Sequence, residues 1–109
     1  MHTHEMFEDI TAKKKEVAQM ERALHETERA IQLEEAIVTL EVCGELEQGK
    51  PRYSNDLVRK AEITRRLFAR PTWQDLVQRQ DTLGQHVKEL TADIGYYEKE
   101  LAYAETSQD

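Results

Sequence analysis

The chain has 109 residues, of which 34% are charged, 39% hydrophobic and 6% aromatic. This mixture, rich in Glu, Leu, Ala, Lys and Arg, is typical of long helices and coiled coils. A net charge of −7 disfavours nucleic acid and anionic membranes as general partners. No apolar run approaches the roughly 20 residues that span a bilayer, residues 1–5 lack a signal-peptide layout, and a single cysteine excludes an intrachain disulfide. We therefore expect a cytoplasmic protein.

The first predicted element is a long helix over residues 5–48. Apolar residues recur there every seven positions, at Ile10, Val17, Leu24, Ile31 and Val38. Phe7 and Met20 fill part of a second row of seam positions. Two such series form the seam through which helices of a coiled coil interlock.

The helix is expected to end at a turn over residues 49–54. Gly49 suits a helix C-terminus and Pro51 cannot continue a helix. Ser54 or Asn55 can cap a short helix over residues 55–69. Pro71 then interrupts the chain and kinks the second arm of the structure.

The last predicted element is a helix over residues 72–106. It carries two seven-residue series. One contains Trp73, Gln80, Val87, Ile94 and Leu101, and the other Leu76, Leu83, Leu90, Tyr97 and Ala104. The pattern predicts an all-α fold in which residues 1–109 form one domain, a long antiparallel helical hairpin of coiled-coil type.

Reversal of the chain at residues 49–54 also predicts which residues face each other. Their numbers sum to about 103 or 104, so the pairs are Phe7 with Tyr97, Met20 with Leu83, Ile31 with Trp73, Glu34 with Arg70 and Glu45 with Arg59.

Further apolar residues lie beside the seam. Leu33, Ile37 and Leu40 widen the apolar face of the first helix, and Tyr96 and Tyr103 lie one heptad apart on the last helix. A helix with a wide apolar face packs against more than one neighbour. We therefore predict a homo-oligomer, a dimer or tetramer, in which hairpins form a bundle through these five residues.

The tip of the hairpin is basic. Arg52, Tyr53, Arg59, Arg66 and Arg70 are candidates for docking an acidic protein partner or a nucleic-acid backbone. The alternative is that these arginines pair with the glutamates of residues 21–47 on the first helix. Tyr53 is the one residue of the tip that could stack on a base, which weakens the nucleic-acid interpretation.

No pattern of residues indicates catalysis, a cofactor or a metal. The four histidines lack the spacing of a metal site, and the four glycines are scattered rather than grouped in a phosphate loop. Cys43 has no neighbour that would activate it and is expected to be buried or half-buried. We therefore predict a protein that is not an enzyme and has no small-molecule substrate.

The leading functional prediction is a structural or adaptor protein that self-associates and contacts another protein. A two-stranded coiled coil offers grooves for helices but little concave space for a small molecule. One alternative is a nucleic-acid-associated accessory protein that uses the basic tip. Another is an inhibitor whose glutamates imitate DNA. In its small size, acidity and hairpin form, the chain resembles many accessory proteins of bacteria and phages.

Overall fold

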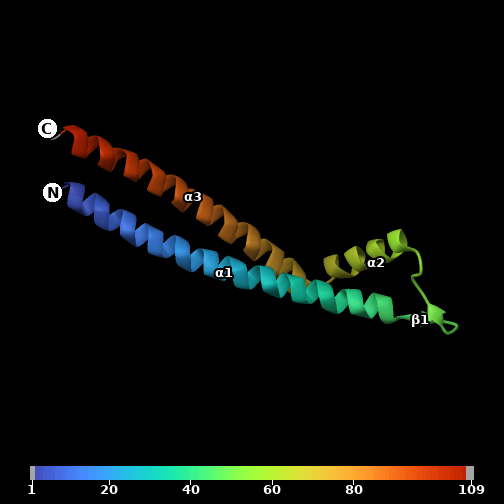
Figure 1. The fold of residues 1–109 in the computed structure, drawn as a ribbon. Coiled ribbons are helices and arrows are strands. Elements are labelled where there is room, and N and C mark those ends of the chain that lie inside the picture. Colours follow the sequence, from blue (N-terminus) through green and yellow to red (C-terminus); the bar gives the residue numbers. More distant parts are fainter. Residues whose placement is uncertain (1, 108–109) are drawn as a thin grey trace. The chain divides into compact units, whose positions relative to one another are not determined.

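The computed structural model of the protein describes residues 2–107 and confirms the all-α fold (Figure 1). Its helices are α1 (His2–Gly44), α2 (Asp56–Phe68) and α3 (Pro71–Ser107). Two short strands, β1 (Leu46–Glu47) and β2 (Lys50–Pro51), separate α1 from α2. Residues 1, 108 and 109 of the predicted domain lie outside the described part.

The chain divides into two compact units. Unit 1 combines the chain up to His25 with the chain from Asp81 onward, and unit 2 is Glu26–Gln80. In unit 1, the first half of α1 and the larger part of α3 run antiparallel (Figure 1). Unit 2 contains the rest of α1, the strands, α2 and the start of α3. The helical hairpin is therefore present, as predicted.

A β-hairpin replaces the last turn of the predicted first helix. The helix ends at Gly44 rather than at residue 48, and Leu46 pairs with Pro51 and Glu47 with Lys50. Gln48 and Gly49 have φ values of 53° and 79°. Positive φ at both residues of a two-residue loop matches the twist of antiparallel strands. Gly49 therefore lies in the turn between two strands, whereas it was expected at a helix C-terminus.

The short helix α2 and the start of α3 have well-defined caps. Asn55 adopts an extended backbone, and its Oδ1 accepts hydrogen bonds from the amides of Leu57 at 2.9 Å and Val58 at 3.2 Å. Pro71 is the first residue of α3, where its missing N–H costs no helical hydrogen bond. The second arm is therefore interrupted at residues 69–70, immediately before the proline.

The core of unit 2 forms where α1 meets α2. Val38 and Val42 are fully buried, with exposed fractions of 0% and 1%, and Leu67 is also buried. Tyr53, Ile63 and Trp73 pack around these three residues. Burial of each such aliphatic side chain contributes about 1.5–3 kcal/mol to the stability of the fold. This cluster therefore holds α2 against α1.

The predicted seam is buried except at its beginning. Phe7, which was expected in the seam, has an exposed fraction of 60%. All other predicted seam residues are buried or half-buried. Met6 is half-buried and takes the place expected for Phe7.

The second seven-residue series of seam positions on α1 contains polar residues, so it does not stand out in the sequence. It starts at Met6 and continues at seven-residue intervals through Lys13, Met20, Thr27 and Glu34, all of them buried or half-buried. Lys13 lies 5.6 Å from the centre of the Tyr97 ring, so its charge is placed on an aromatic face. Polar side chains at such positions interrupt the apolar pattern from which a seam is recognised.

In unit 1 the two arms meet about one heptad away from the predicted register. Met20 lies in one depression with Leu90, seven residues beyond its expected neighbour Leu83. Trp73, which was expected to face Ile31, packs on the cluster of Val38, Val42 and Leu67. A seven-residue repeat fits almost as well after a slip of one heptad. Nearer the point of chain reversal, in unit 2, Arg70 still pairs with Glu34 as the predicted register requires.

Candidate functional site

Three surfaces of the chain carry the residues expected to act in binding. One is an exposed apolar stripe on α1 in unit 2. Another is a groove lined by tyrosines in unit 1. The third is the basic tip, which contains the residues between the hairpin and α3.

The apolar stripe consists of Leu33, Ile37 and Leu40 on α1, with exposed fractions of 62%, 37% and 73%. Their spacings of four and three residues place them on one face of the helix. The half-buried Ala30 and the exposed Gly44 lie seven residues to either side of Ile37. A Cβ atom added to Gly44 would meet no atom within 4 Å, so the end of the stripe is open.

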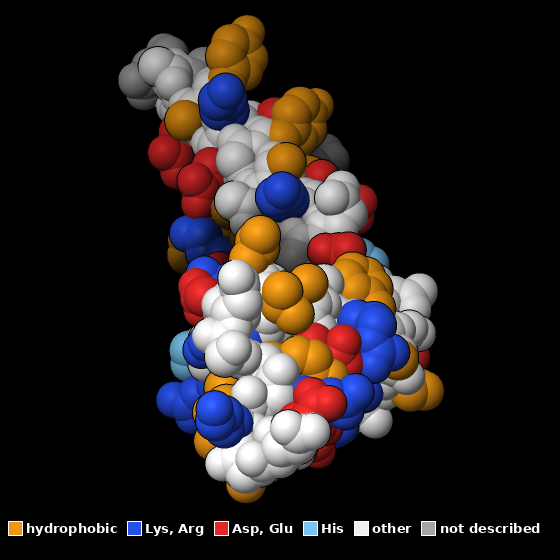
Figure 2. Space-filling model, turned by 90° about the vertical axis from the view of Figure 1, so that its right-hand side faces the viewer, with side chains coloured by type: hydrophobic (Ala, Val, Ile, Leu, Met, Phe, Trp, Pro, Cys, Tyr) orange, Lys and Arg blue, Asp and Glu red, His pale blue; other side chains and the backbone are white. Residues whose placement is uncertain are grey.

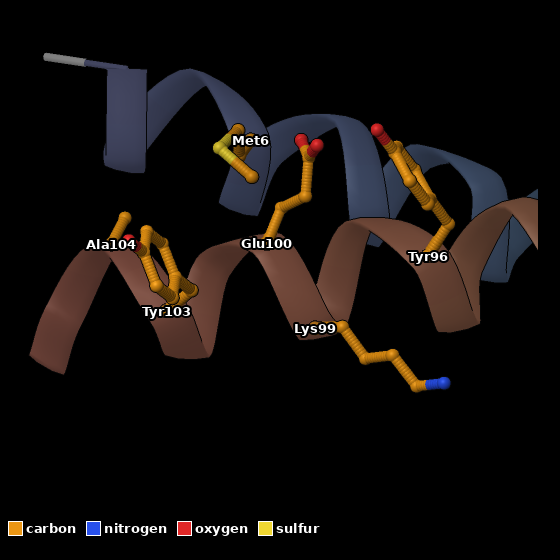
Figure 3. A pocket seen from close by; sticks show the side chains of 6 residues that line it. All are labelled: Met6, Tyr96, Lys99, Glu100, Tyr103 and Ala104. Atoms are coloured by element: carbon orange, nitrogen blue, oxygen red, sulfur yellow. The ribbon is translucent and has the colours of Figure 1, made fainter.

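The tyrosine groove is an open depression of about 530 Å³ in unit 1, lined by Met6, Tyr96, Lys99, Glu100, Tyr103 and Ala104. In Figure 3, Met6 comes from α1, while Tyr96 and Glu100 point from α3 towards it. Lys99 points away from α1 (Figure 3). A hydrogen bond with the Glu100 carboxylate raises the pKa of the Tyr96 hydroxyl above its ordinary value. Tyr96 and Tyr103 are 59% and 76% exposed.

The arginines at the tip are paired with carboxylates of the same chain. Arg66 Nη1 lies 2.6 Å from Glu45 Oε1, and Arg66 Nε donates to Glu62 at 2.8 Å. Arg70 Nη2 lies 2.6 Å from Glu34 Oε2, as expected from the sequence. Figure 2 shows acidic and basic side chains side by side over this end of unit 2.

Two further arginines of the tip are also engaged. Arg52 lies 3.5 Å from Glu45 and its guanidinium covers the ring of the half-buried Tyr53. Arg59 lies 3.8 Å from Asp56 and donates hydrogen bonds to the carbonyls of residues 53 and 54. Glu45, expected near Arg59, forms its ion pairs with Arg52 and Arg66 instead. The geometry supports the structural role of the tip. Arg66 joins α2 to Glu45 just beyond the end of α1, and Arg70, between α2 and α3, joins Glu34 of α1.

The ion pairs of the tip predict a loss of stability in acid. Hydrogen bonds from Arg65 and Arg66 lower the pKa of Glu62 from 4.5 to about 2, and a bond from Arg66 lowers the pKa of Glu45. A carboxyl whose pKa is lowered by folding stabilises the fold at pH values above its pKa in the unfolded chain. This stabilisation disappears as the pH falls through its pKa in the folded protein. We expect the melting temperature to drop between pH 4.5 and about 2.

The matched comparison is between Glu62→Gln and Glu41→Gln. Each replacement removes one carboxyl, but Glu41 is exposed while Glu62 is half-buried. Calorimetric melting at several pH values should show a shallower acid-dependent fall for Glu62→Gln and an unchanged slope for Glu41→Gln. Equal slopes in the two variants would contradict the role given to Glu62.

The structure corrects one further expectation. Cys43 is exposed rather than buried, on the solvent side of α1. Within residues 2–107, no group of three or more His, Cys, Asp or Glu side chains is placed to hold a metal ion. The helices of this part of the chain are also either too short or too polar to cross a bilayer.

Sequence reasoning identified the exposed stripe and both exposed tyrosines, but not the groove between the arms. The groove depends on Met6, which becomes visible only once the true second series of α1 is known. Comparison with known proteins adds no further assignment: no family model, curated protein or solved structure matches this chain.

Proposed function

We propose that this protein is a non-enzymatic adaptor that forms a homodimer through the apolar stripe of α1. The observation that carries the proposal is the exposure of Leu33, Ile37 and Leu40 on one helical face. Exposed apolar residues in a contiguous row mark interaction sites more often than isolated ones do.

The stripe is nearly symmetric about Ile37, which favours a second copy of the chain as its occupant. Leu33 and Leu40 lie four and three residues from it, and the small residues Ala30 and Gly44 lie seven residues away on either side. In an antiparallel pair, Ile37 would lie near the twofold axis, and Leu33 of one copy would contact Leu40 of the other. Such self-complementarity is what a twofold interface requires.

Light scattering at micromolar concentration tests the dimer. We expect a particle of at least twice 12.7 kDa. The dimer should strengthen when salt is raised from about 0.05 M to about 0.5 M, because salt screens the repulsion between two acidic chains. A particle of 12.7 kDa under both conditions would contradict the proposal.

Substitutions on α1 test whether the stripe is the interface. The double change Leu33→Asp and Leu40→Asp should yield a monomer with unchanged helicity, because both side chains are exposed in the single chain. Gln32→Asp is the matched control, since Gln32 is exposed but lies about 100° around the helix from Leu33. A double variant that stays dimeric would place the interface elsewhere.

The nucleic-acid alternative has less support. It needs unpaired cations at the tip, whereas Arg52, Arg59, Arg66 and Arg70 each lie within ion-pair distance of a carboxylate. Binding through phosphates would weaken steeply with salt, opposite to the dependence expected for the dimer. DNA mimicry by the glutamates of α1 remains a proposal from the sequence alone.

A further inference from the structure

The tyrosine groove combines apolar walls with a carboxylate at its centre. Met6, Tyr96 and Tyr103 supply the walls, and Glu100 lies between the tyrosines in the sequence of α3. Spacings of four and three residues place Tyr96, Glu100 and Tyr103 on one face of α3. The groove therefore offers aromatic surface and negative charge to the same ligand.

The other two tyrosines of the chain show what such rings contact in this protein. The ring of Tyr97 is covered by Lys13 at 5.6 Å, and the ring of Tyr53 by Arg52 at 5.3 Å and Arg66 at 5.9 Å. Tyr96 and Tyr103 remain exposed to solvent in the part of the chain that the structure describes. A cation over a tyrosine ring is attracted by the ring's electron-rich face.

The negative charge extends along α3 beyond the groove. Glu89 and Asp93 precede Tyr96 by seven and three residues and so continue the same face. They line a neighbouring depression of unit 1 together with Glu16, Met20, His86 and Leu90. From Glu89 to Tyr103 this face is about 21 Å long, or about four helical turns.

We propose that the tyrosine groove and the adjoining acidic face of α3 bind an amphipathic helix of another protein, whose arginine or lysine side chains lie on Tyr96 and Tyr103 beside Glu100. This inference rests on the proposed adaptor function and specifies the chemistry of its partner. Complementary charge selects a basic helix and repels nucleic acid. The short helix α2 of a second copy fits less well, because its exposed cations Lys60 and Arg65 are paired with Asp56 and Glu62.

A designed peptide provides the test. The probe is a fluorescein-labelled amphipathic helix of Leu, Ala and Arg, about 18 residues long to cover the face at 1.5 Å per residue. Fluorescence anisotropy with the full chain should show saturable binding that weakens as salt is raised. The same peptide with Glu in place of every Arg should not bind.

Variants of the groove separate specific contact from general charge attraction. Tyr96→Ala and Tyr103→Ala should each lower the affinity about two- to fivefold, which corresponds to about 0.5–1 kcal/mol per exposed cation–π contact. Tyr103→Phe should keep the affinity because the ring remains. Glu100→Gln should weaken binding more than Glu105→Gln, which removes the same charge about 140° around α3.

Several results would overturn the inference. They are absence of binding by the Arg peptide, equal binding by the Tyr96→Ala/Tyr103→Ala double variant, and equal effects of the two glutamate variants. Light scattering on the same samples keeps the two proposals apart. A dimer that does not bind the peptide refutes the groove alone, whereas a monomer refutes the proposed dimer. If the tyrosine variants convert the dimer to a monomer, the groove belongs to a second copy and the basic-helix inference fails.

Discussion

Replacing Val38 with Asp is expected to unfold unit 2. Val38 has an exposed fraction of 0% and packs with Val42 and Leu67 in the cluster that joins α1 to α2. A buried charge without a partner costs about 3–5 kcal/mol, a large part of the 5–15 kcal/mol that stabilises a typical domain. Circular dichroism should show a loss of helix at room temperature, and urea unfolding a much lower midpoint.

The control for this prediction is Leu40→Asp, two residues along the same helix. Leu40 is 73% exposed, so the same aspartate remains in water and the helicity should be preserved. Both variants are expected to be monomeric, which removes the effect of dimerisation on apparent stability. Coincident urea curves for Val38→Asp and Leu40→Asp would show that Val38 is not in the core.

Replacing Gly84 and Gly95 with alanine is expected to stabilise the protein. Both glycines lie inside α3, and a Cβ atom added at either would meet no atom within 4 Å. Alanine is favoured over glycine in a helix interior by about 1 kcal/mol, so the double variant should gain about 2 kcal/mol. For a chain of this size, each kcal/mol raises the melting temperature by roughly 4–8 °C.

At a third glycine, replacement by alanine is expected to lower the melting temperature. Gly49 has a φ of 79° in the turn of the β-hairpin, a conformation that costs alanine about 1–2 kcal/mol. Calorimetry should therefore show a higher melting temperature for Gly84→Ala and Gly95→Ala and a lower one for Gly49→Ala. A lower melting temperature for the α3 variants would mean that the added methyl groups are not accommodated as the structure indicates.

Local patterns were sufficient to predict most of the helices. The seven-residue series that contain Ile10 and Ile31 on α1, and Trp73 and Leu101 on α3, identify two long amphipathic helices. Asn55 identifies the start of α2 through its own side chain. These features depend on residues that are close in the sequence, so they can be recognised without knowledge of the partner arm.

The hairpin at the tip was not recognised, although its turn has a local signal. Gln48 and Gly49 stand between short segments that can pair, but a helical pattern precedes them without a break. The structure ends α1 at Gly44 because residues 46–47 and 50–51 gain strand hydrogen bonds around a turn with two positive φ values. At these residues, the turn favours the strand conformation over a continued helix.

By itself the sequence determined that the chain forms long helices, that these pair through heptad seams, and that Leu33, Ile37, Leu40, Tyr96 and Tyr103 lie outside the seams. Only the tertiary structure decided the register of unit 1, the place of Met6 in the seam and the partners of Arg52 and Arg66. The physical reason is that heptads repeat: a slip of seven residues keeps nearly every apolar contact. Contacts far apart in sequence, such as Trp73 on Val38 and Arg66 on Glu45, distinguish one register from the next.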